Sequence, residues 1–207
     1  MLTTDIMTVK QELLNSVKPY AFGTGRYPTP AELADLERLI RALERENSYP
    51  DLKESFSCLE GMWQCLFTSS KYVLDLNKIP FVHLSAVYQR VYINRAKNEG
   101  HYLNIAELSR GSTVKIACGE YAAIKPSTAA PTQVEVQYNY FYFAIRLLSA
   151  YEGRVRLAAE LENNHLPGSI RLPFRKSGWQ STVYLDDDLR IVYGNQGGLF
   201  VLAKQPE

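Results

Sequence analysis

The C-terminal part of the chain, residues 178–204, constrains the fold most strongly. Residues 179–185 alternate between two kinds of side chain, with the period of two that a β-strand shows. The acidic residues 186–188 then favour a turn. A second apolar run covers residues 189–193, and a Gly-rich turn leads to a third run at 199–203. This pattern predicts three antiparallel strands joined by two short turns.

The first quarter of the chain has a different period. Ile6, Val9, Leu13 and Val17 recur at helical spacing, which predicts an amphipathic helix over about residues 4–17. Residues 29–32, with the sequence TPAE, form a capping box with proline at the first helical position. The helix that follows should end near residue 47, before the next proline. We therefore expect an α-helical segment over residues 1–57.

Strand-like alternation returns after residue 59. The expected strands cover residues 62–67, 84–95, 101–109, 113–124 and 133–143. The last of these is the most regular, and its Val134, Val136, Tyr138, Tyr140 and Tyr142 should share one face. Residues 146–164 fit a helix ambiguously, and residues 166–175, with two prolines, are expected to be a loop or a weak edge strand.

The order of these elements selects a fold class. Seven or eight strands follow one another without the alternation of strands and helices that parallel sheets need. Consecutive antiparallel strands of this number commonly close into a barrel, because closure removes exposed sheet edges. We therefore expect a mainly β fold, with an antiparallel barrel over residues 58–207 and the helical segment 1–57 packed on it. About eight strands leave an interior just wide enough for side chains or one small ligand.

Composition and charge exclude several classes of protein. The net charge of +1 gives no general attraction to nucleic acid. Three cysteines, Cys58, Cys65 and Cys118, lack metal or redox spacing, so we expect reduced thiols. No apolar run approaches the roughly 20 residues needed to cross a bilayer. The N-terminus shows no signal peptide, and Asp5 and Glu12 disfavour a transit peptide, so the chain is expected to work where it is made or to be a mature form.

The sequence offers no convincing catalytic or metal site. His83, His101 and His165 are far apart and have no second ligand at suitable spacing, so we expect no metal and no cofactor. The acidic residues 186–188 are better explained by a turn than by acid–base chemistry. No Ser or Cys lies in the context of an activated nucleophile. An enzyme is therefore the less favoured class.

Several segments resemble one known family. Residues 184–191 (YLDDDLRI), the Gly-rich turn and residues 199–202 resemble the C-terminal signature of the plastid lipid-associated proteins, the PAP/fibrillin family. Residues 10–14, 39–44 and 59–70 resemble the family's opening pattern, and Gln89 and Asn104 fall where fibrillins commonly carry Gln and Asn. Residues 61–63 (GMW) are similar to the Gly-x-Trp of lipocalins, to which fibrillins are structurally similar. Residues 193–195 and 144–173 depart from the family pattern.

The resemblance implies a lipocalin-like carrier of a lipophilic small molecule, such as an isoprenoid, a carotenoid, a quinone or an acyl lipid. It also implies a cytoplasmic protein or one peripheral on thylakoid membranes, linked to photoprotection. With no transit peptide, a cyanobacterial member is expected. Contact with a membrane should come from the apolar face of the first helix or from loops at the barrel mouth. Two alternatives stay open: a lipocalin-shaped bilin lyase, and a structural protein that coats membranes or photosynthetic complexes without an internal ligand.

Two groups of residues are candidates for the site. Ligand binding is assigned to Trp63, Phe67, Gln89, Val91, Asn104, Val136, Tyr138 and Tyr140. The tyrosines among them are equally suited to filling a barrel core, and only the family resemblance favours a partial cavity. Closure of the barrel is assigned to Gly61, Trp63 and Arg190, because in lipocalin-like barrels an Arg near the last strand covers this Trp. The alternative is that Arg190 points into solvent beside Asp188.

Overall fold

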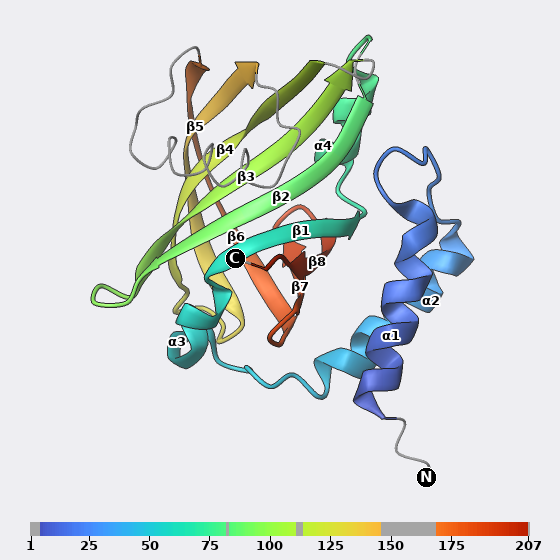
Figure 1. Cartoon of the computed structure of the whole chain (residues 1–207). Coiled ribbons are helices and arrows are strands. Elements are labelled where there is room, and N and C mark those ends of the chain that lie inside the picture. Colours follow the sequence, from blue (N-terminus) through green and yellow to red (C-terminus); the bar gives the residue numbers. More distant parts are fainter. Residues whose placement is uncertain (1–4, 82, 111–113, 146–168, 207) are drawn as a thin grey trace.

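The computed structural model describes residues 5–81, 83–110, 114–145 and 169–206. Eight antiparallel strands form a closed barrel, in which each strand pairs with the next and β1 pairs with β8 (Figure 1). Helices precede the first strand. The expectation of a mainly β fold, with an antiparallel barrel and N-terminal helices, is therefore confirmed.

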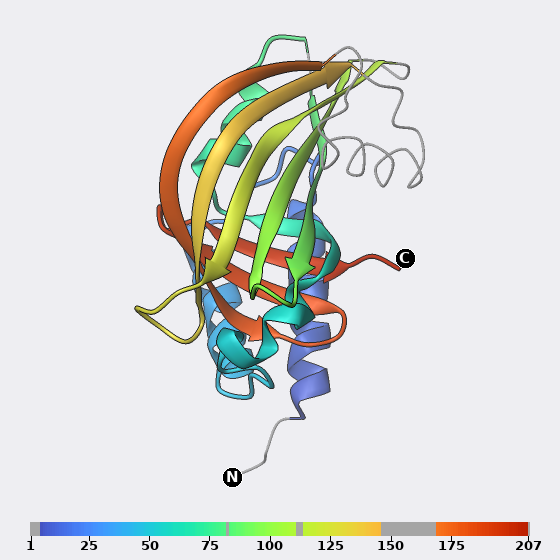
Figure 2. The ribbon, with the colours of Figure 1, turned by 90° about the vertical axis from the view of Figure 1, so that its left-hand side faces the viewer.

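The strands differ in length around the barrel. Their bounds are β1 (Gly61–Thr68), β2 (His83–Asn94), β3 (Glu99–Arg110), β4 (Val114–Pro126), β5 (Gln133–Ile145), β6 (Ser169–Leu185), β7 (Leu189–Gly194) and β8 (Leu199–Lys204). β1, β7 and β8 have 8, 6 and 6 residues, whereas β2 to β6 have 12 to 17. The long strands therefore curve well beyond the short ones (Figures 1 and 2).

Two helices lie against the outer face of the short strands. α1 (Ile6–Val17) starts at the N-cap Asp5, and α2 (Pro30–Glu44) starts with the expected capping box; the short η1 (Lys18–Tyr20) follows α1. Their apolar faces bury Leu13 and Ile40 against Leu189 and Val201 of β7 and β8. The apolar face of α1 is therefore used inside the fold.

Short helices lie at each end of the barrel. α3 (Leu52–Ser55) and η2 (Phe56–Leu59) precede β1 and lie at the end opposite α4 (Figure 1). Their Leu52 and Phe56 pack in one cluster with the inward-facing Trp63 and Tyr102. We call this filled part of the interior the closed half. α4 (Lys71–Leu74) and η3 (Asp75–Lys78) lie toward the other end, next to Leu84 and Leu108.

A β-bulge in β5 changes which way its tyrosines face. The pairing of β5 with β6 shifts between Tyr138 and Tyr140, so the extra residue reverses the alternation. Tyr138 packs with the interior cluster, whereas Tyr140 and Tyr142 belong to a cluster on the outer face with Tyr121. The expectation that all five residues share one face is therefore wrong beyond Tyr138.

The same bulge explains a second difference. Residues 169–175 were expected to be a loop or weak edge, yet they form the first part of β6, the longest strand. Pro173 pairs with Tyr140 directly after the register shift, a position at which a strand tolerates proline. Residues 146–164, for which the sequence favoured a helix ambiguously, lie outside the described residues.

Candidate ligand-binding site

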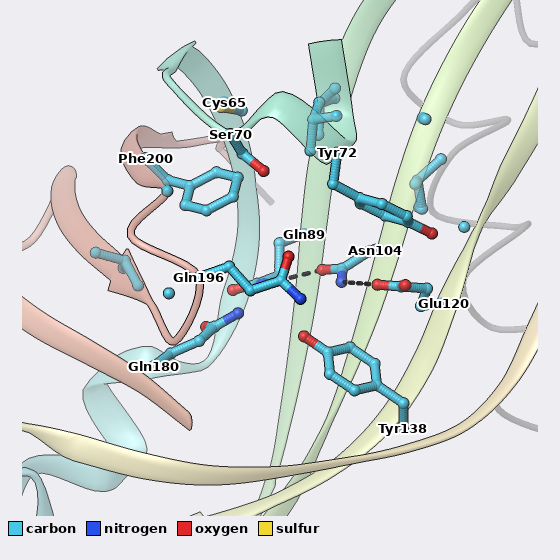
Figure 3. A pocket seen from close by; sticks show the side chains of 18 of the residues that line it. Cys65, Ser70, Tyr72, Gln89, Asn104, Glu120, Tyr138, Gln180, Gln196 and Phe200 are labelled. Carbon is cyan, nitrogen blue, oxygen red and sulfur yellow. Dashed lines mark hydrogen bonds between the residues drawn. The ribbon is translucent and has the colours of Figure 1, made fainter. Parts of the chain in front are cut away.

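A cavity of about 200 Å³ occupies the interior beyond the closed half (Figure 3). We call this part the hollow half. Much of its wall is apolar, formed by Cys65, Val73, Leu76, Val87, Ala106, Cys118, Phe141, Val192, Phe200 and Leu202. Its polar lining comprises Ser70, Tyr72, Gln89, Asn104, Glu120, Tyr138, Lys176, Gln180, Asn195 and Gln196. An apolar wall with a few convergent polar groups is the usual character of a small-molecule site.

Arg190 forms the floor between the two halves. It is fully buried, and its guanidinium donates hydrogen bonds to Oε1 of Gln89 at 2.8 Å and to the hydroxyl of Tyr102 at 2.9 Å. A longer bond of 3.4 Å reaches Oγ1 of Thr182. The guanidinium carbon also lies 5.6 Å from the centre of the Tyr102 ring. Four contacts on three other strands fix this charge below the cavity.

A row of polar side chains continues from the floor across β2, β3 and β4. Gln89 and Asn104 are paired in register, and Nε2 of Gln89 donates to Oδ1 of Asn104 at 2.9 Å. Nδ2 of Asn104 in turn donates to Oε2 of Glu120 at 3.3 Å. The row therefore runs from a buried cation to a carboxyl group, with both amides oriented by their neighbours (Figure 3).

Glu120 is the acidic group of the cavity. Burial raises the pKa of its carboxyl, because the charged form is poorly solvated there. The Tyr72 hydroxyl, the Asn104 amide and the charge of Lys176 oppose this effect without cancelling it. A carboxyl with a raised pKa in a partly apolar cavity can accept a hydrogen bond and, when protonated, donate one.

The two thiols in the cavity wall are poorly suited to act as nucleophiles. Burial raises the pKa of Cys118 to about 11 and that of Cys65 further still. At neutral pH both therefore stay as thiols, which are poor nucleophiles. Among the described residues, His, Cys, Asp and Glu side chains also form no group of three that could hold a metal ion.

The mouth of the cavity is marked by side chains that are partly exposed. Tyr72 of α4 is 53% exposed and Trp179 of β6 is 39% exposed, although both line the cavity. Gln180, the next residue along β6, is only 9% exposed. Figure 3 shows the side chains of Gln180, Gln196 and Tyr138 converging on one point in the cavity. Exposure thus falls steeply from the mouth to the interior.

One atom of the Gln180 amide lacks a hydrogen-bond partner among the described residues. Its Oε1 is buried and has no hydrogen-bond partner within the part of the chain that the structure describes. A buried polar atom without a partner costs stability unless a ligand or a water fills the need. The cavity therefore offers at least one unsatisfied polar side chain to a ligand.

The structure brings three of the eight expected ligand-binding residues to this cavity: Gln89, Asn104 and Tyr138. Trp63, Val91 and Val136 fill the closed half instead. Phe67 faces outward after a bulge in β1 and packs under the helices. Tyr140 lies on the outer face, stacked on Tyr121 with 5.0 Å between ring centres.

The expected stacking of Arg190 on Trp63 is replaced by two separate pairs. Arg190 is buried as expected, but the ring beneath its guanidinium belongs to Tyr102. The cation over Trp63 is Lys204, whose Nζ lies 5.3 Å from the ring centre. Lys204 is the direct partner of Trp63 in the β1–β8 register, which explains the exchange.

Gly61 makes room for the Lys204 side chain over Trp63, a contact that we call the latch. Its φ is +132°, and a Cβ built on it would lie 2.7 Å from Cε of Lys204. The Lys204 stem therefore crosses the strand where the glycine leaves space. Trp63 also donates from Nε1 to the carbonyl oxygen of Leu59 at 2.8 Å, which ties the ring to η2.

Sequence reasoning missed Glu120, Lys176, Gln180 and Tyr72. Glu120 carried a usable signal, because it follows Cys118 by two residues and so shares its face on an apolar strand. Lys176 lay between the expected loop or weak edge of residues 166–175 and the strand predicted from residue 179, so it was assigned to neither. Tyr72 belongs to α4, a four-residue helix that is too short to produce a helical period.

None of the helices in the described ranges has both the length and the apolar character that a membrane crossing needs. The apolar faces of α1 and α2 pack on the barrel.

Comparisons with known proteins cover nearly all of the chain. The family model PAP_fibrillin matches residues 7–203. The chain is 25% identical to plastoglobulin-1 of Pisum sativum, a chloroplast protein, over 83% of its own length and 54% of the relative. It is 27% identical to probable plastid-lipid-associated protein 3 of Arabidopsis thaliana, over 83% of the chain and 52% of the relative. It therefore spans about half the length of both proteins.

A third relative is matched more completely. The light-induced chloroplast protein of Solanum tuberosum is 22% identical over 98% of the chain and 68% of its own length. These relatives come from plants, and the expectation of a cyanobacterial source stays a prediction. Except for the first residue of α1 and the last residue of β8, the family match includes both N-terminal helices and all eight strands. The chain belongs to the PAP/fibrillin family.

Proposed function

We propose that this protein binds one lipophilic small molecule in the hollow half of its barrel and carries it at a lipid surface, without chemical turnover. The observation that carries the proposal is the cavity itself, with its apolar wall and one row of polar groups. The names of two relatives, plastoglobulin and plastid-lipid-associated protein, point to lipid association and support the same conclusion.

The candidate ligands are an isoprenoid, a carotenoid, a quinone or an acyl lipid. We extend the proposal to thylakoid membranes and to photoprotection, which the family resemblance implies. The raised pKa values of the cavity thiols argue against a covalent thiol adduct with such a ligand at neutral pH.

The proposal is tested by native mass spectrometry of the protein purified from its own host, followed by extraction of bound lipid. A carotenoid, quinone or acyl lipid at close to one per chain is expected. A covalent bilin would favour the alternative of a bilin lyase. An empty chain would favour a structural protein that coats membranes or photosynthetic complexes.

A variant that fills the cavity gives a second test. Ala106→Phe places a ring into the hollow half, since Ala106 lines the cavity. The bound lipid should be lost while the far-UV circular dichroism is kept. Ala123→Phe is the matched control, because Ala123 pairs with His101 on the neighbouring strand and does not line the cavity. Lipid retained at full occupancy in Ala106→Phe would refute the site.

Contact with the lipid surface is assigned to the mouth. The first helix was one of two expected contact sites, but its apolar residues Leu13 and Val17 are buried against the barrel. At the mouth, Tyr72 lines the cavity, and Ile79 and the 80% exposed Phe81 follow it in the chain. Washing membranes with alkaline carbonate should release the protein, and Phe81→Ser should weaken its recovery on vesicles. Retention after carbonate would contradict peripheral contact.

A further inference from the structure

We infer that the ligand binds head first, with an uncharged, hydrogen-bonding head group against the row formed by Gln89, Asn104 and Glu120, and with its apolar tail left at the mouth. This inference rests on the proposed function, because it names the chemical class and the orientation of the ligand in the same cavity.

The cavity is large enough to enclose only part of a lipid. Its volume is about 200 Å³. Sites that enclose most of a drug-sized molecule commonly have about 300–1,000 Å³. A carotenoid, a prenylated ring or a long acyl chain therefore extends beyond the cavity, and one end must remain outside.

The gradient of exposure decides which end is enclosed. The buried part of the cavity holds the amides of Gln89 and Gln180, which are 8% and 9% exposed. The exposed part holds the rings of Tyr72 and Trp179. Tyrosine and tryptophan suit a boundary between an apolar phase and water. A polar head group thus finds its partners inside, whereas an apolar tail finds aromatic rings and the lipid phase outside.

The amide oxygen of Gln180, unpaired among the described residues, defines which hydrogen-bonding groups the head group must offer. Oε1 of Gln180 is buried without a partner within the described ranges. The Gln196 and Tyr138 side chains point to the same spot (Figure 3). Amide and phenol groups include both donors and acceptors. A hydroxyl group matches this set, because it donates one hydrogen bond and accepts others.

The charges of the site disfavour an ionised head group. Arg190 could bind a carboxylate, but it is buried in the floor, is not part of the cavity lining, and already donates to Gln89 and Tyr102. A ligand carboxylate would instead meet the carboxyl of Glu120, and like charges disfavour each other. An ammonium would be attracted to Glu120, but it would lose its hydration beside the amides of Gln89 and Asn104 and would meet the positive charge of Lys176.

Matched probes of equal tail length test the head group. Dodecanol, dodecanoic acid and dodecylamine are titrated at pH 8 into the delipidated protein, and binding is followed by displacement of a fluorescent lipophile. Dodecanol should bind about ten times more tightly than either ionised probe, a difference of about 1.4 kcal/mol. Equal or tighter binding of the acid or the amine would overturn the inference.

A pair of charge-removing variants sharpens this test. Glu120→Gln should improve the affinity for dodecanoic acid several-fold, because it removes the competing carboxyl, and should change the affinity for dodecanol less. Glu135→Gln is the control, since Glu135 is a partly exposed partner of Lys125 that does not line the cavity. An unchanged affinity for the acid in Glu120→Gln would contradict the role of this carboxyl.

The two tryptophans report the orientation. Trp179 lies at the mouth and Trp63 in the closed half, and they are the only two in the sequence. Dodecanol brominated at the end of its tail should quench the fluorescence of Trp179, because bromine quenches on contact. The quenching should disappear in Trp179→Phe and persist in Trp63→Phe. Quenching that persists in Trp179→Phe would show the tail deep in the barrel and overturn the orientation.

The two failures are distinguishable. If none of the three probes binds to the folded, delipidated protein, the proposed function fails. If they bind without preference for the alcohol, or bind tail first, the proposed function stands and this inference fails.

Discussion

The closed and hollow halves of the barrel are built from the same strands, but their inward side chains differ in size. On β2 and β3, Val91 and Tyr102 meet in the closed half, whereas Val87 and the small Ala106 face the cavity. The large Trp63 and the plug of α3 and η2 complete the closed half. The comparison teaches that strand alternation sets which residues face inward, while side-chain volume and the buried Arg190 decide where the interior is empty.

Replacement of Arg190 should have the largest effect on this division. Arg190→Ala would leave the buried oxygens of Gln89 and Tyr102 without their donor, so we expect a loss of about 3 kcal/mol in the free energy of unfolding. Urea unfolding measures it. Arg190→Lys should recover only part, because an ammonium cannot reproduce the planar fork. Arg41→Ala, at an exposed pair with Glu37, should cost at most about 0.5 kcal/mol. A similarly small loss at Arg190 would show that the floor is not a structural partition.

The anchor of the helices on the short strands should come next. Lys10 of α1 forms ion pairs with Asp186 and Asp188 of the β6–β7 turn. Burial alone would raise the pKa of Asp186, but hydrogen bonds from Lys10, Tyr184 and the Asp188 amide lower it to about 2. An unfolded Asp titrates near 3.9, so Asp186 adds on the order of 2 kcal/mol of stability above about pH 4.

This contribution has a defined sign. Because the folded pKa is the lower one, the stabilisation is present above the unfolded pKa and is lost as the pH falls from about 4 to about 2. Asp186→Asn should remove it, so the difference in stability from the wild type should shrink over that window. Asp187→Asn is the control, because Asp187 is exposed on the same turn. Parallel pH profiles for the wild type and Asp186→Asn would contradict the anchor.

Two valines on one strand compare the halves directly. Val91 and Val87 both face inward from β2, but Val91 is fully buried in the closed half and Val87 lines the cavity. Val91→Ala opens a new void and should cost about 2 kcal/mol, whereas Val87→Ala enlarges an existing one and should cost about 1 kcal/mol or less. Val87→Ala should also weaken ligand binding, and Val91→Ala should not. Equal stability losses would indicate that both halves are packed alike.

The latch at the closed half should have the smallest effect. Lys204→Met keeps the apolar stem and removes the ammonium above Trp63, so we expect a loss of about 0.5–1 kcal/mol. The emission of Trp63, recorded in the Trp179→Phe background, should shift. No change in emission would argue against the ring contact.

Much of the fold follows from patterns of short range. The capping box of α2, the period of α1 and the turns at residues 186–188 and 194–198 are local, and the structure contains all of them. The bulge after Tyr138 is different, because it depends on how β5 meets β6 across the barrel. One extra residue there moved Tyr140 to the outside, a displacement that no alternation pattern encodes.

The site residues were harder to predict from the sequence, because they too depend on contacts across the barrel. Gln89 and Asn104 could be named because they resemble family positions, and they do line the cavity. Arg190 was expected to be buried, but its partner depends on which ring faces it across the interior. Glu120 could have been predicted to line the cavity only by giving weight to one charged residue on an otherwise apolar face of β4.

The ion pair between Lys10 and Asp186 joins residues 176 positions apart, and β8 completes the sheet only by pairing with β1. During synthesis, the apolar faces of α1 and α2 therefore stay exposed until β7 and β8, on which they pack, have left the ribosome. Contacts of such long sequence separation slow folding and prolong exposure of apolar surface. The helices are synthesised first but can pack on the barrel only after the last strands have been made. A nascent chain would therefore need protection of its apolar helix faces, by a chaperone or a lipid surface, until β8 has been synthesised.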